Sequence, residues 1–400
     1  MRTLYVGLDV SKDDFKAAVK DDQNNLVMPP KSYKHDRSGL ESFDRNVDEI
    51  KERFECNAIF GMEATGIYHL SLYQHLMDRQ VHVKVFNTLE LKRFKGRIRK
   101  TKTDELDAIA IAEALLLVRE PSYHPTSEPE LIHLRELCRL RDRLVKLASR
   151  CKIHATRDMD VLCRGYVNLF DDIFSPSSIA VLKASVRKTR LFKTDVRELT
   201  DILSRFMSRS GSEDKAKKLS NLFKNTVIPE HMREICILEI HILIQQYEVL
   251  KQQRKRIEDR IENCIEKINP WMITVPGIGP LTAGVILGEL GDICRFNSPD
   301  QLTAYSGLDP SVMESGRSRR TGHISKRGSP ILRETLYNAA FAAIRVNPVC
   351  KQFYQRLKSK GKHHKVCLVA VAKKLLHIAY SVERNKRNFY IPSYIESNGI

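Results

Sequence analysis

Apolar and polar positions alternate along the first 120 residues in the way that strands and helices require. Residues 3–10 place Leu4, Val6 and Leu8 on one face of a strand. The pattern further predicts strands at 15–20, 25–30, 57–62 and 81–86 and helices at 38–53, 67–78 and 103–118. Three hairpin-like strands followed by alternating helices and strands favour an α/β domain with a mixed sheet of the ribonuclease H type. A doubly wound sheet fits the pattern nearly as well.

A heptad repeat begins after the prolines at 121, 125 and 129. Steps of three and four residues define two apolar seams. The first contains Leu137, Leu140, Leu144, Leu147 and Cys151, and the second contains Ile235, Leu238, Ile242, Gln245, Val249, Ile257, Ile261, Ile265 and Ile268. The spacing predicts coiled-coil helices at 126–160 and 232–269, as an antiparallel hairpin or a dimer stalk. Amphipathic helices packed on a domain would give the same repeat. The basic insert at 161–231 indicates no particular chemistry.

These patterns divide the chain into an α/β domain at 1–125, the coiled-coil region, a helical domain at 270–383 and a tail at 384–400. Near the start of the helical domain, PGIGP at 276–280 resembles a helix-hairpin-helix turn. Gly277 and Gly279 allow a tight turn, after which the N–H groups of the next helix can face a phosphate. Such binding is independent of base sequence. An ordinary Gly-Pro connection between helices is the alternative.

The net charge of the chain limits the kinds of molecule that it is expected to bind. The 67 Lys and Arg residues exceed the 49 Asp and Glu residues, which gives a formal net charge of +18. An excess of this size suggests a polyanion and disfavours a small acidic substrate as the only ligand. The sequence contains no apolar run long enough to span a bilayer and no signal-peptide layout. Its nine cysteines form no C-x-x-C pair, which favours reduced thiols in the cytoplasm over a zinc ribbon or a disulfide scaffold.

Four carboxylates stand where strands end or a helix begins. Asp9 ends the first strand, Glu63 follows the buried strand, and Asp104 and Asp107 lie one turn apart at a helix start. Carboxylates that converge in this way suit Mg²⁺, with Mn²⁺ as a substitute, because hard cations prefer oxygen ligands. Two such ions can clamp a phosphodiester during displacement. Each carboxylate alone would be read as a solvated or capping residue.

Two basic segments lie next to candidate catalytic residues. The run at 92–102 leads directly into Asp104, and we expect it to contact nucleic acid through Lys95, Arg97, Arg99, Lys100 and Lys102. From 316 to 374 the sequence has fifteen basic residues and one acidic residue, Glu334. The residues that we expect to touch nucleic acid in this second segment are Arg317, Arg319, Arg320, Lys326 and Arg327.

Ser315 lies at the start of the second basic segment, next to Gly316. A serine hydroxyl surrounded by arginines can attack phosphorus, since guanidinium groups stabilise the developing charge. Residue type alone leaves the choice open. The other serines of this neighbourhood are Ser306, Ser311, Ser318 and Ser325.

Taken together, these motifs resemble the DEDD transposases of one bacterial insertion-sequence group, known as bridge-RNA-guided recombinases, which have Piv-type DNA invertases as relatives. The resemblance covers residues 3–118 and 270–382. It rests on GLDVSK at 7–12, MEATG at 62–66, KTDELDA at 102–108, PGIGP at 276–280, and SG at 315–316 with ISKRG at 324–328. The chain departs from the family in having Glu314 where Ser is frequent and in a longer insert at 161–231.

The resemblance implies a RuvC-like domain in which Asp9, Glu63, Asp104 and Asp107 bind Mg²⁺. It implies that Ser315 forms a covalent phosphoserine link to DNA. It also implies a structured bridge RNA that pairs with donor and target DNA, and a homo-oligomer, either a dimer or a tetramer. In that oligomer one subunit's metal domain meets another's serine domain.

Three functions compete on the sequence. The first is an RNA-guided recombinase or transposase of an insertion sequence. The second is a metal-dependent, RuvC-like junction nuclease that only hydrolyses DNA. The third is a non-catalytic nucleic-acid-binding protein, which the presence of all four carboxylates disfavours.

Overall fold

The computed structural model describes residues 3–63, 67–86, 91, 104–117, 129–186, 192–315, 318–326 and 328–391, with the backbone alone at 104–105, 129, 310–315 and 318–323. The chain divides into two compact units, Met1–Glu128 and Pro129–Ile400. Each unit has its own elements and core, so each is described by itself.

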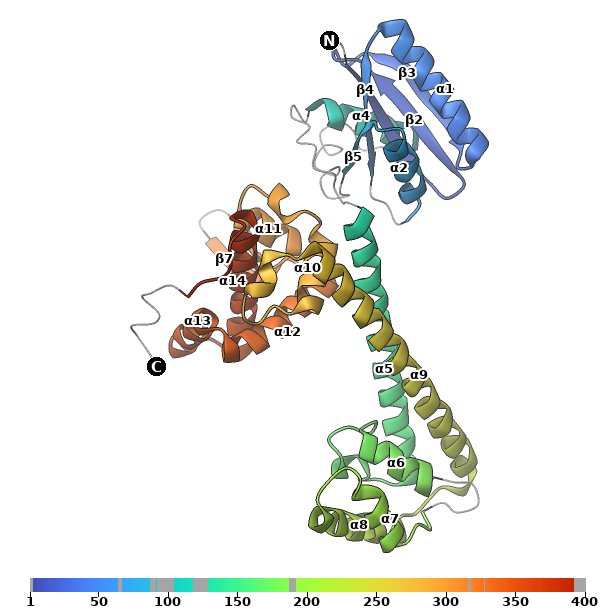
Figure 1. Cartoon of the computed structure of the whole chain (residues 1–400), viewed down its shortest axis with the longest axis vertical. Coiled ribbons are helices and arrows are strands. Elements are labelled where there is room, and N and C mark those ends of the chain that lie inside the picture. The colour runs from blue at the N-terminus through green and yellow to red at the C-terminus, as the bar shows by residue number, and fades with distance from the viewer. Residues whose placement is uncertain are drawn as a thin grey trace. The chain divides into compact units, whose positions relative to one another are not determined.

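The first unit is built on a five-stranded mixed sheet (Figure 1). Its strands are β1 (Thr3–Val10), β2 (Asp14–Lys20), β3 (Leu26–Lys34), β4 (Asn57–Glu63) and β5 (His82–Phe86). The order is β3-β2-β1-β4-β5, with antiparallel pairing among β1, β2 and β3 and parallel pairing of β1 with β4 and β4 with β5. The predicted mixed sheet is therefore confirmed. The doubly wound alternative is wrong, because short turns make β1, β2 and β3 an antiparallel meander.

Helices cover both faces of this sheet. On one face α1 (Arg37–Phe54) inserts Phe43 between Phe15 and Phe60, at ring-centroid distances of 5.3 and 6.2 Å. On the other face α4 (Asp104–Leu117) packs mainly on the central strand β1 and its neighbour β2. The third helix, α2 (His69–Asp78), packs beside β5.

The strands and helices predicted for this unit are confirmed, with one difference in length. The predicted third strand ends at Pro30, whereas β3 continues to Lys34. Two consecutive prolines inside a strand argue against strand structure, because proline cannot donate to the ladder. Here they are tolerated because β3 is an edge strand with a neighbour on one side only.

The second unit contains two long helices, α5 (Pro129–Leu162) and α9 (Glu230–Ile268), that pack side by side (Figure 1). Arg141 bonds Glu258 at 2.9 Å, and Arg157 bonds Glu239 at 3.0 Å. Because the partner number falls as the α5 number rises, the pair is antiparallel within one chain.

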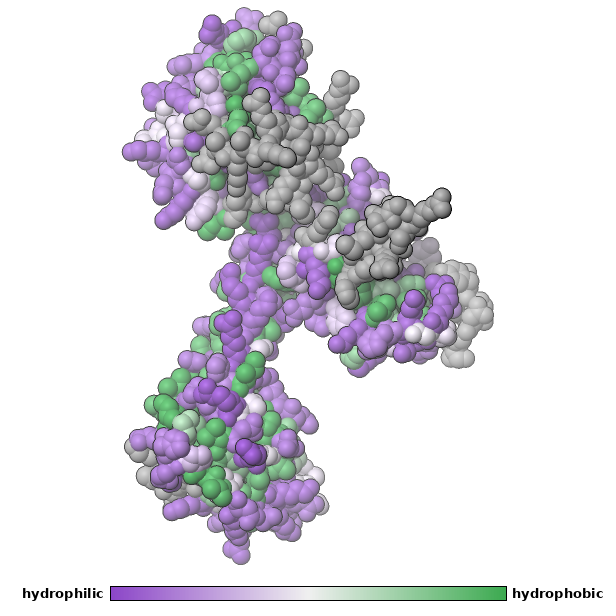
Figure 2. Space-filling view, turned by 180° about the vertical axis from the view of Figure 1, so that it is seen from behind, coloured by the Kyte–Doolittle hydropathy of each residue, from purple (hydrophilic) through white to green (hydrophobic). Residues whose placement is uncertain are grey.

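Only part of the seam predicted in α9 is buried. Ile261 and Ile265 lie in the core, and Ile257 and Ile268 pack against it. The residues of the predicted seam that remain exposed are Ile235, Leu238, Ile242 and Val249. Instead, the residues buried in this half of α9 are Cys236, Ile237, Ile240, Leu243 and Ile244. The helix is apolar on two faces here, and the neighbouring helices bury the second one. Figure 2 shows apolar residues among hydrophilic ones on the surface of this part of the molecule.

The insert between the long helices is a small helical domain. It consists of α6 (Pro176–Ser185), α7 (Val196–Leu203) and α8 (Arg209–Lys224). Its core forms with the adjoining ends of α5 and α9 around Tyr166, which is fully buried and bonds Ser178. The insert therefore shares one hydrophobic core with the ends of the two long helices.

The remainder of this unit packs around a buried helix, α10 (Pro280–Leu290). A Cβ atom at Gly288 would lie 2.8 Å from Cα of Arg135, so α10 touches the backbone of α5. Arg139 holds the buried carboxylate of Glu289 in two hydrogen bonds of 2.8 and 3.1 Å. The other helices are α11 (Pro299–Ser306), α12 (Pro330–Val346), α13 (Pro348–Ser359) and α14 (His364–Arg384).

The start of the second basic segment forms a β-hairpin, which corrects the prediction of a helical domain throughout 270–383. Strand β6 (Pro310–Ser315) pairs antiparallel with β7 (Ser318–Ile324). Ser, Arg and Gly make up most of β7, and β6 contains Pro, Ser and Glu, so the composition is more typical of loops than of strands. Among the described residues, no helix is long and apolar enough to cross a membrane.

Candidate functional site

Asp9 and Glu63 stand side by side at the ends of neighbouring parallel strands. The register pairs Leu8 with Met62, so the next residues on the two strands are Asp9 and Glu63. Neighbouring strands lie about 4.8 Å apart. The pairing of β1 with β4 thus brings together two carboxylates that are 54 positions apart in the sequence.

Both carboxylates face α4. A Cβ atom at Gly7 would lie 2.1 Å from the Ala108 carbonyl oxygen, and one at Gly61 would lie 2.8 Å from the Leu115 side chain. Gly7 and Gly61 therefore face α4. Side chains alternate along a strand, so the residues two positions later, Asp9 and Glu63, face the same way.

The direction of α4 brings Asp107 to the same end of the sheet. Lys20, which pairs with Tyr5 near the start of β1, forms an ion pair with Glu113. Because Ala108 lies over Gly7, helix α4 runs antiparallel to β1 and its first turn lies toward Asp9. Asp104 begins this turn, although its side chain lies outside the described residues.

The chemistry of this cluster fits a hard divalent cation. Asp9, Glu63 and Asp107 offer carboxylate oxygens only, with no thiolate or imidazole in the set, and such ligands suit Mg²⁺ or Mn²⁺. Among the described side chains, no group of three or more carboxylate, imidazole or thiol residues already forms a metal site. The predicted basic residues beside the cluster, Lys95, Arg97, Arg99, Lys100 and Lys102, lie outside the described residues.

Ser315 is the last residue of β6 and pairs with Ser318, the first residue of β7. Only Gly316 and Arg317 connect the two strands, so the serine stands at the tip of the hairpin. Arg319 and Arg320 follow on β7, where they pair with Glu314 and Met313. The side chains at the tip lie outside the described residues, as do Arg317 and Arg327.

Two of the alternative serines use their hydroxyl groups in hydrogen bonds within the protein. Ser306 is fully buried, and its hydroxyl donates to the Thr303 carbonyl oxygen at 2.9 Å. The Ser325 hydroxyl donates to the Asp309 carboxylate. The Ser306 hydroxyl is too deeply buried to reach a phosphate. Ser325 is only partly buried and stays an alternative, because a hydroxyl that donates to a carboxylate can also be activated for attack. Ser311 and Ser318 remain as alternatives to Ser315 on the hairpin.

The base of the hairpin is fixed by contacts that sequence reasoning missed. The Ser325 amide donates to the Asp309 carbonyl oxygen at 2.8 Å, and the exposed Lys326 has a left-handed backbone with φ of 55°. Arg333 is one of the fifteen basic residues between 316 and 374. It donates to the Gly328 carbonyl oxygen at 2.6 Å, and burial lowers its pKa. The contact between Asp309 and Ser325 joins residues sixteen positions apart, so no local sequence pattern predicts it.

The predicted helix-hairpin-helix turn has its two glycines in different roles. Gly277 has φ of 102°, and its Cβ would lie 2.6 Å from Cβ of Ala343. Gly279 is exposed, caps the N-terminus of α10, and has nothing within 4 Å of a built Cβ. The first glycine is required by the turn, whereas the second leaves the start of α10 open to solvent.

We expect Gly277→Ala and Gly279→Ala to differ in stability. The first adds a strained backbone and an overpacked Cβ, and should lower the free energy of unfolding by about 1–3 kcal/mol. The second has ordinary φ and free space, and should change it by less than about 1 kcal/mol. Chemical denaturation of both variants measures the difference. Equal losses would contradict the assignment of roles.

Two family models match the chain. One is described as a transposase of the IS116/IS110/IS902 family and covers residues 271–355. The other is a transposase model of the IS110 DEDD type and covers residues 6–162. Together they cover more than half of the chain, and they include the carboxylate cluster, the Gly277–Gly279 turn and the hairpin.

Curated proteins agree with these matches. An insertion element IS116 protein from Streptomyces clavuligerus is 24% identical over 96% of both chains. A transposase for insertion sequence element IS1328 from Yersinia enterocolitica is 25% identical over 94% of this chain and 96% of its own. A pilin gene-inverting protein from Moraxella bovis is 34% identical over 32% of this chain and 41% of its own. Some relatives match over only about a third of their length.

The chain belongs to the IS110/IS116 family of DEDD transposases. Membership makes this transposase an enzyme that acts on DNA, and the DEDD type implies a divalent metal ion. In the transposase the carboxylate cluster and the serine hairpin belong to different units, Met1–Glu128 and Pro129–Ile400.

Proposed function

We propose that this transposase is an RNA-guided DNA recombinase that moves an insertion sequence through a covalent phosphoserine intermediate. The observation that carries the proposal is the arrangement of Asp9, Glu63 and the first turn of α4 at one end of the sheet. A second support is the position of Ser315 at the tip of a basic hairpin.

In the first unit, Asp9, Glu63, Asp104 and Asp107 would hold Mg²⁺. The ion supplies charge stabilisation to the scissile phosphate. The protein's own contribution is to fix the carboxylates. The β1–β4 ladder sets the spacing of Asp9 and Glu63, and the close packing of Ala108 on Gly7 sets the height of α4 above them.

In the second unit, the Ser315 Oγ attacks the phosphorus. A P–O bond to Oγ forms, the P–O bond to one deoxyribose breaks, and that sugar leaves as a hydroxyl. The reverse reaction, with a different sugar hydroxyl, rejoins the strand. The phosphodiester energy is retained in the phosphoserine, so strand exchange needs no nucleotide cofactor.

We propose a homo-oligomer, either a dimer or a tetramer, as the working form. Four apolar residues of α9 support this: Ile235, Leu238, Ile242 and Val249 are exposed at heptad spacing. Such a stripe is self-complementary about a two-fold axis, as a dimer of identical chains requires.

Removal of RNA tests whether a guide RNA directs recombination. We expect the purified transposase to carry a structured RNA. Ribonuclease treatment should abolish recombination between donor and target DNA, and adding back the extracted RNA should restore it. Sequencing of the co-purified RNA identifies the species, and ribonuclease inactivated before addition is the control. Full recombination by RNA-free protein would contradict RNA guidance and leave transposition without a guide.

A further inference from the structure

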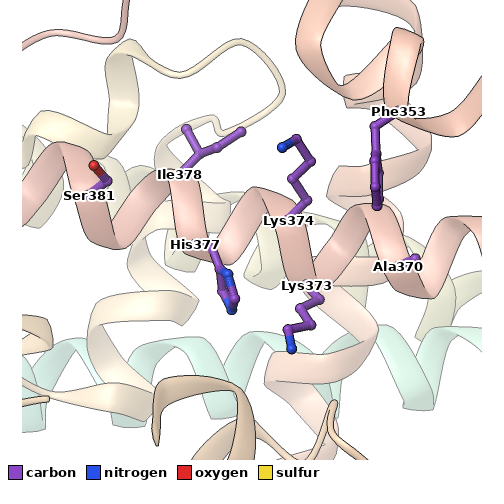
Figure 3. Close-up of a pocket in the computed structure, with 7 residues that line it drawn as sticks. All are labelled: Phe353, Ala370, Lys373, Lys374, His377, Ile378 and Ser381. Atoms are coloured by element: carbon purple, nitrogen blue, oxygen red, sulfur yellow. The ribbon is translucent and has the colours of Figure 1, made fainter. Parts of the chain in front are cut away.

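A shallow groove of about 360 Å³ lies along α14, outside the carboxylate cluster, the hairpin and the Gly277–Gly279 turn. The residues that line it come from α13 and α14 and are Phe353, Ala370, Lys373, Lys374, His377, Ile378 and Ser381 (Figure 3). The spacing of the α14 residues at steps of three and four places them along one side of the helix. The groove is small, near the lower limit for pockets that bind organic ligands.

The groove combines an apolar floor with cations. Phe353, Ala370 and Ile378 supply carbon surface, and Lys373 and Lys374 supply two ammonium groups. The Lys374 ammonium lies 5.3 Å from the centre of the Phe353 ring, and the Arg356 guanidinium lies 5.2 Å from the same centre. Two cations, Lys374 and Arg356, therefore lie over one aromatic ring, and Lys373 adds a third cation on the other side of α14 (Figure 3).

Carboxylates hardly offset this charge. The sequence contains no Asp or Glu between Thr335 and Val382, so α13 and nearly all of α14 carry none. Among the described residues, Lys374 has no carboxylate partner. Lys373 bonds Asp300 of α11 at 3.3 Å, but Asp300 is 84% exposed. An exposed pair of this kind contributes little, and a competing anion can displace it.

The wall on the α11 side is fixed and neutral. The Thr303 hydroxyl donates to the Pro299 carbonyl oxygen at 2.9 Å, which leaves its oxygen to accept from Nε2 of His377 at 2.7 Å. Burial, helped by Lys373, lowers the pKa of His377. An imidazole held in this way positions the wall and leaves the lysines to bind the anion.

We propose that this groove binds one unpaired nucleotide of a single-stranded segment, with its phosphate on Lys374 and its base against Phe353 and Ile378. A duplex backbone would satisfy the lysines but leave the apolar floor uncovered, because paired bases are stacked inside the helix. An unpaired base has a free apolar face, and aromatic side chains with nearby cations are the usual platform for it.

This proposal rests on the proposed function in one respect, that the chain handles nucleic acid. DNA and RNA share the chemistry, so the experiment uses both. Fluorescence anisotropy of the full chain would be measured with short labelled oligothymidylate, oligouridylate and a blunt DNA duplex. If the unmodified chain binds none of them, the proposed function fails together with the groove.

Three variants address the groove itself. Lys374→Ala should weaken binding of a single strand roughly three- to tenfold, and lower the slope of log K against log salt by about 0.7, the value for one lost phosphate contact. Phe353→Leu keeps the apolar volume but removes the ring. It should weaken binding of a single strand by at least about fivefold. Asp300→Asn removes the competing carboxylate and should tighten binding. Phe353→Leu should change duplex binding by less than about twofold, because paired bases do not reach the ring.

Lys365→Ala is the matched control, because Lys365 is an exposed lysine of the same helix outside the groove. It should change neither the affinity nor the slope measurably. Equal losses for Lys365→Ala and Lys374→Ala would overturn the proposal in favour of diffuse charge attraction. Loss confined to the duplex, or unchanged binding by Phe353→Leu, would also overturn it. The tighter of the two single strands identifies the nucleic acid that the groove takes.

Discussion

Replacing Asp9 by alanine should abolish strand cleavage while the protein stays folded. Asp9 lies near the end of β1 and is only half-buried, so the protein should tolerate a small side chain there. A bound divalent cation contributes several kcal/mol to a phosphodiester transition state, and each 1.4 kcal/mol is tenfold in rate. We therefore expect losses of roughly 10²–10³-fold or more for Asp9→Ala, Glu63→Ala, Asp104→Ala and Asp107→Ala, measured by recombination of labelled donor and target DNA.

Asp22→Ala provides a matched control. Asp22 is an exposed carboxylate in the turn between β2 and β3, at the opposite end of the sheet from Asp9. It should retain full activity. Circular dichroism and thermal unfolding would show that each variant is folded. Chelation by EDTA should stop the wild-type reaction, and Mg²⁺ or Mn²⁺ should restore it. Full activity in EDTA, or in the Asp9 and Glu63 variants, would rule out the metal cluster.

The sheet of the first unit could be predicted because its signals are local. Alternation in residues 3–10 and a polar turn at 21–25 specify the meander, and short apolar runs specify β4 and β5. The positions of Asp9 and Glu63 at strand ends were also readable. Their adjacency was not, because it depends on the parallel register of β1 with β4, and no local pattern sets that register.

The second unit shows where local patterns fail. The heptad seam through Ile235 and Leu238 was a correct reading of one apolar face of α9, but the chain buries the other face against α5 and the insert. A helix that is apolar on two sides does not itself specify which side is covered. The hairpin at 310–324 was missed for a related reason, since long-range contacts at its base, such as Asp309 with Ser325, hold strands of low intrinsic propensity.

No pattern in the sequence predicts the groove along α14. Phe353 and Lys374 are 21 positions apart and on different helices, and their contact arises from the packing of α13 on α14. Sequence analysis could count the basic residues in this region. It could not separate Lys374, which lies over an aromatic ring, from Arg333, which binds backbone carbonyl oxygens.

Ser315→Ala should bind DNA normally and form no covalent protein–DNA adduct. In the proposed reaction the Ser315 Oγ is the atom that becomes bonded to phosphorus, so its removal leaves nothing to form the ester. Removal of a nucleophile costs several orders of magnitude in enzymes of comparable design, and we expect a loss of roughly 10³-fold or more. The adduct would be detected as a labelled DNA band that migrates with the protein on a denaturing gel.

Ser318→Ala is the control for this experiment. Ser318 pairs directly with Ser315 across the hairpin, so its loss changes the same tip and the same composition. It should leave the adduct intact. An adduct that persists in Ser315→Ala but disappears in Ser318→Ala would transfer the nucleophile to Ser318. If the wild-type protein cleaves DNA without any adduct, the carboxylate cluster acts by hydrolysis and the transposase is a junction nuclease, because metal-activated water then replaces the serine. The two mechanisms are thus separated by one hydroxyl group at the hairpin tip.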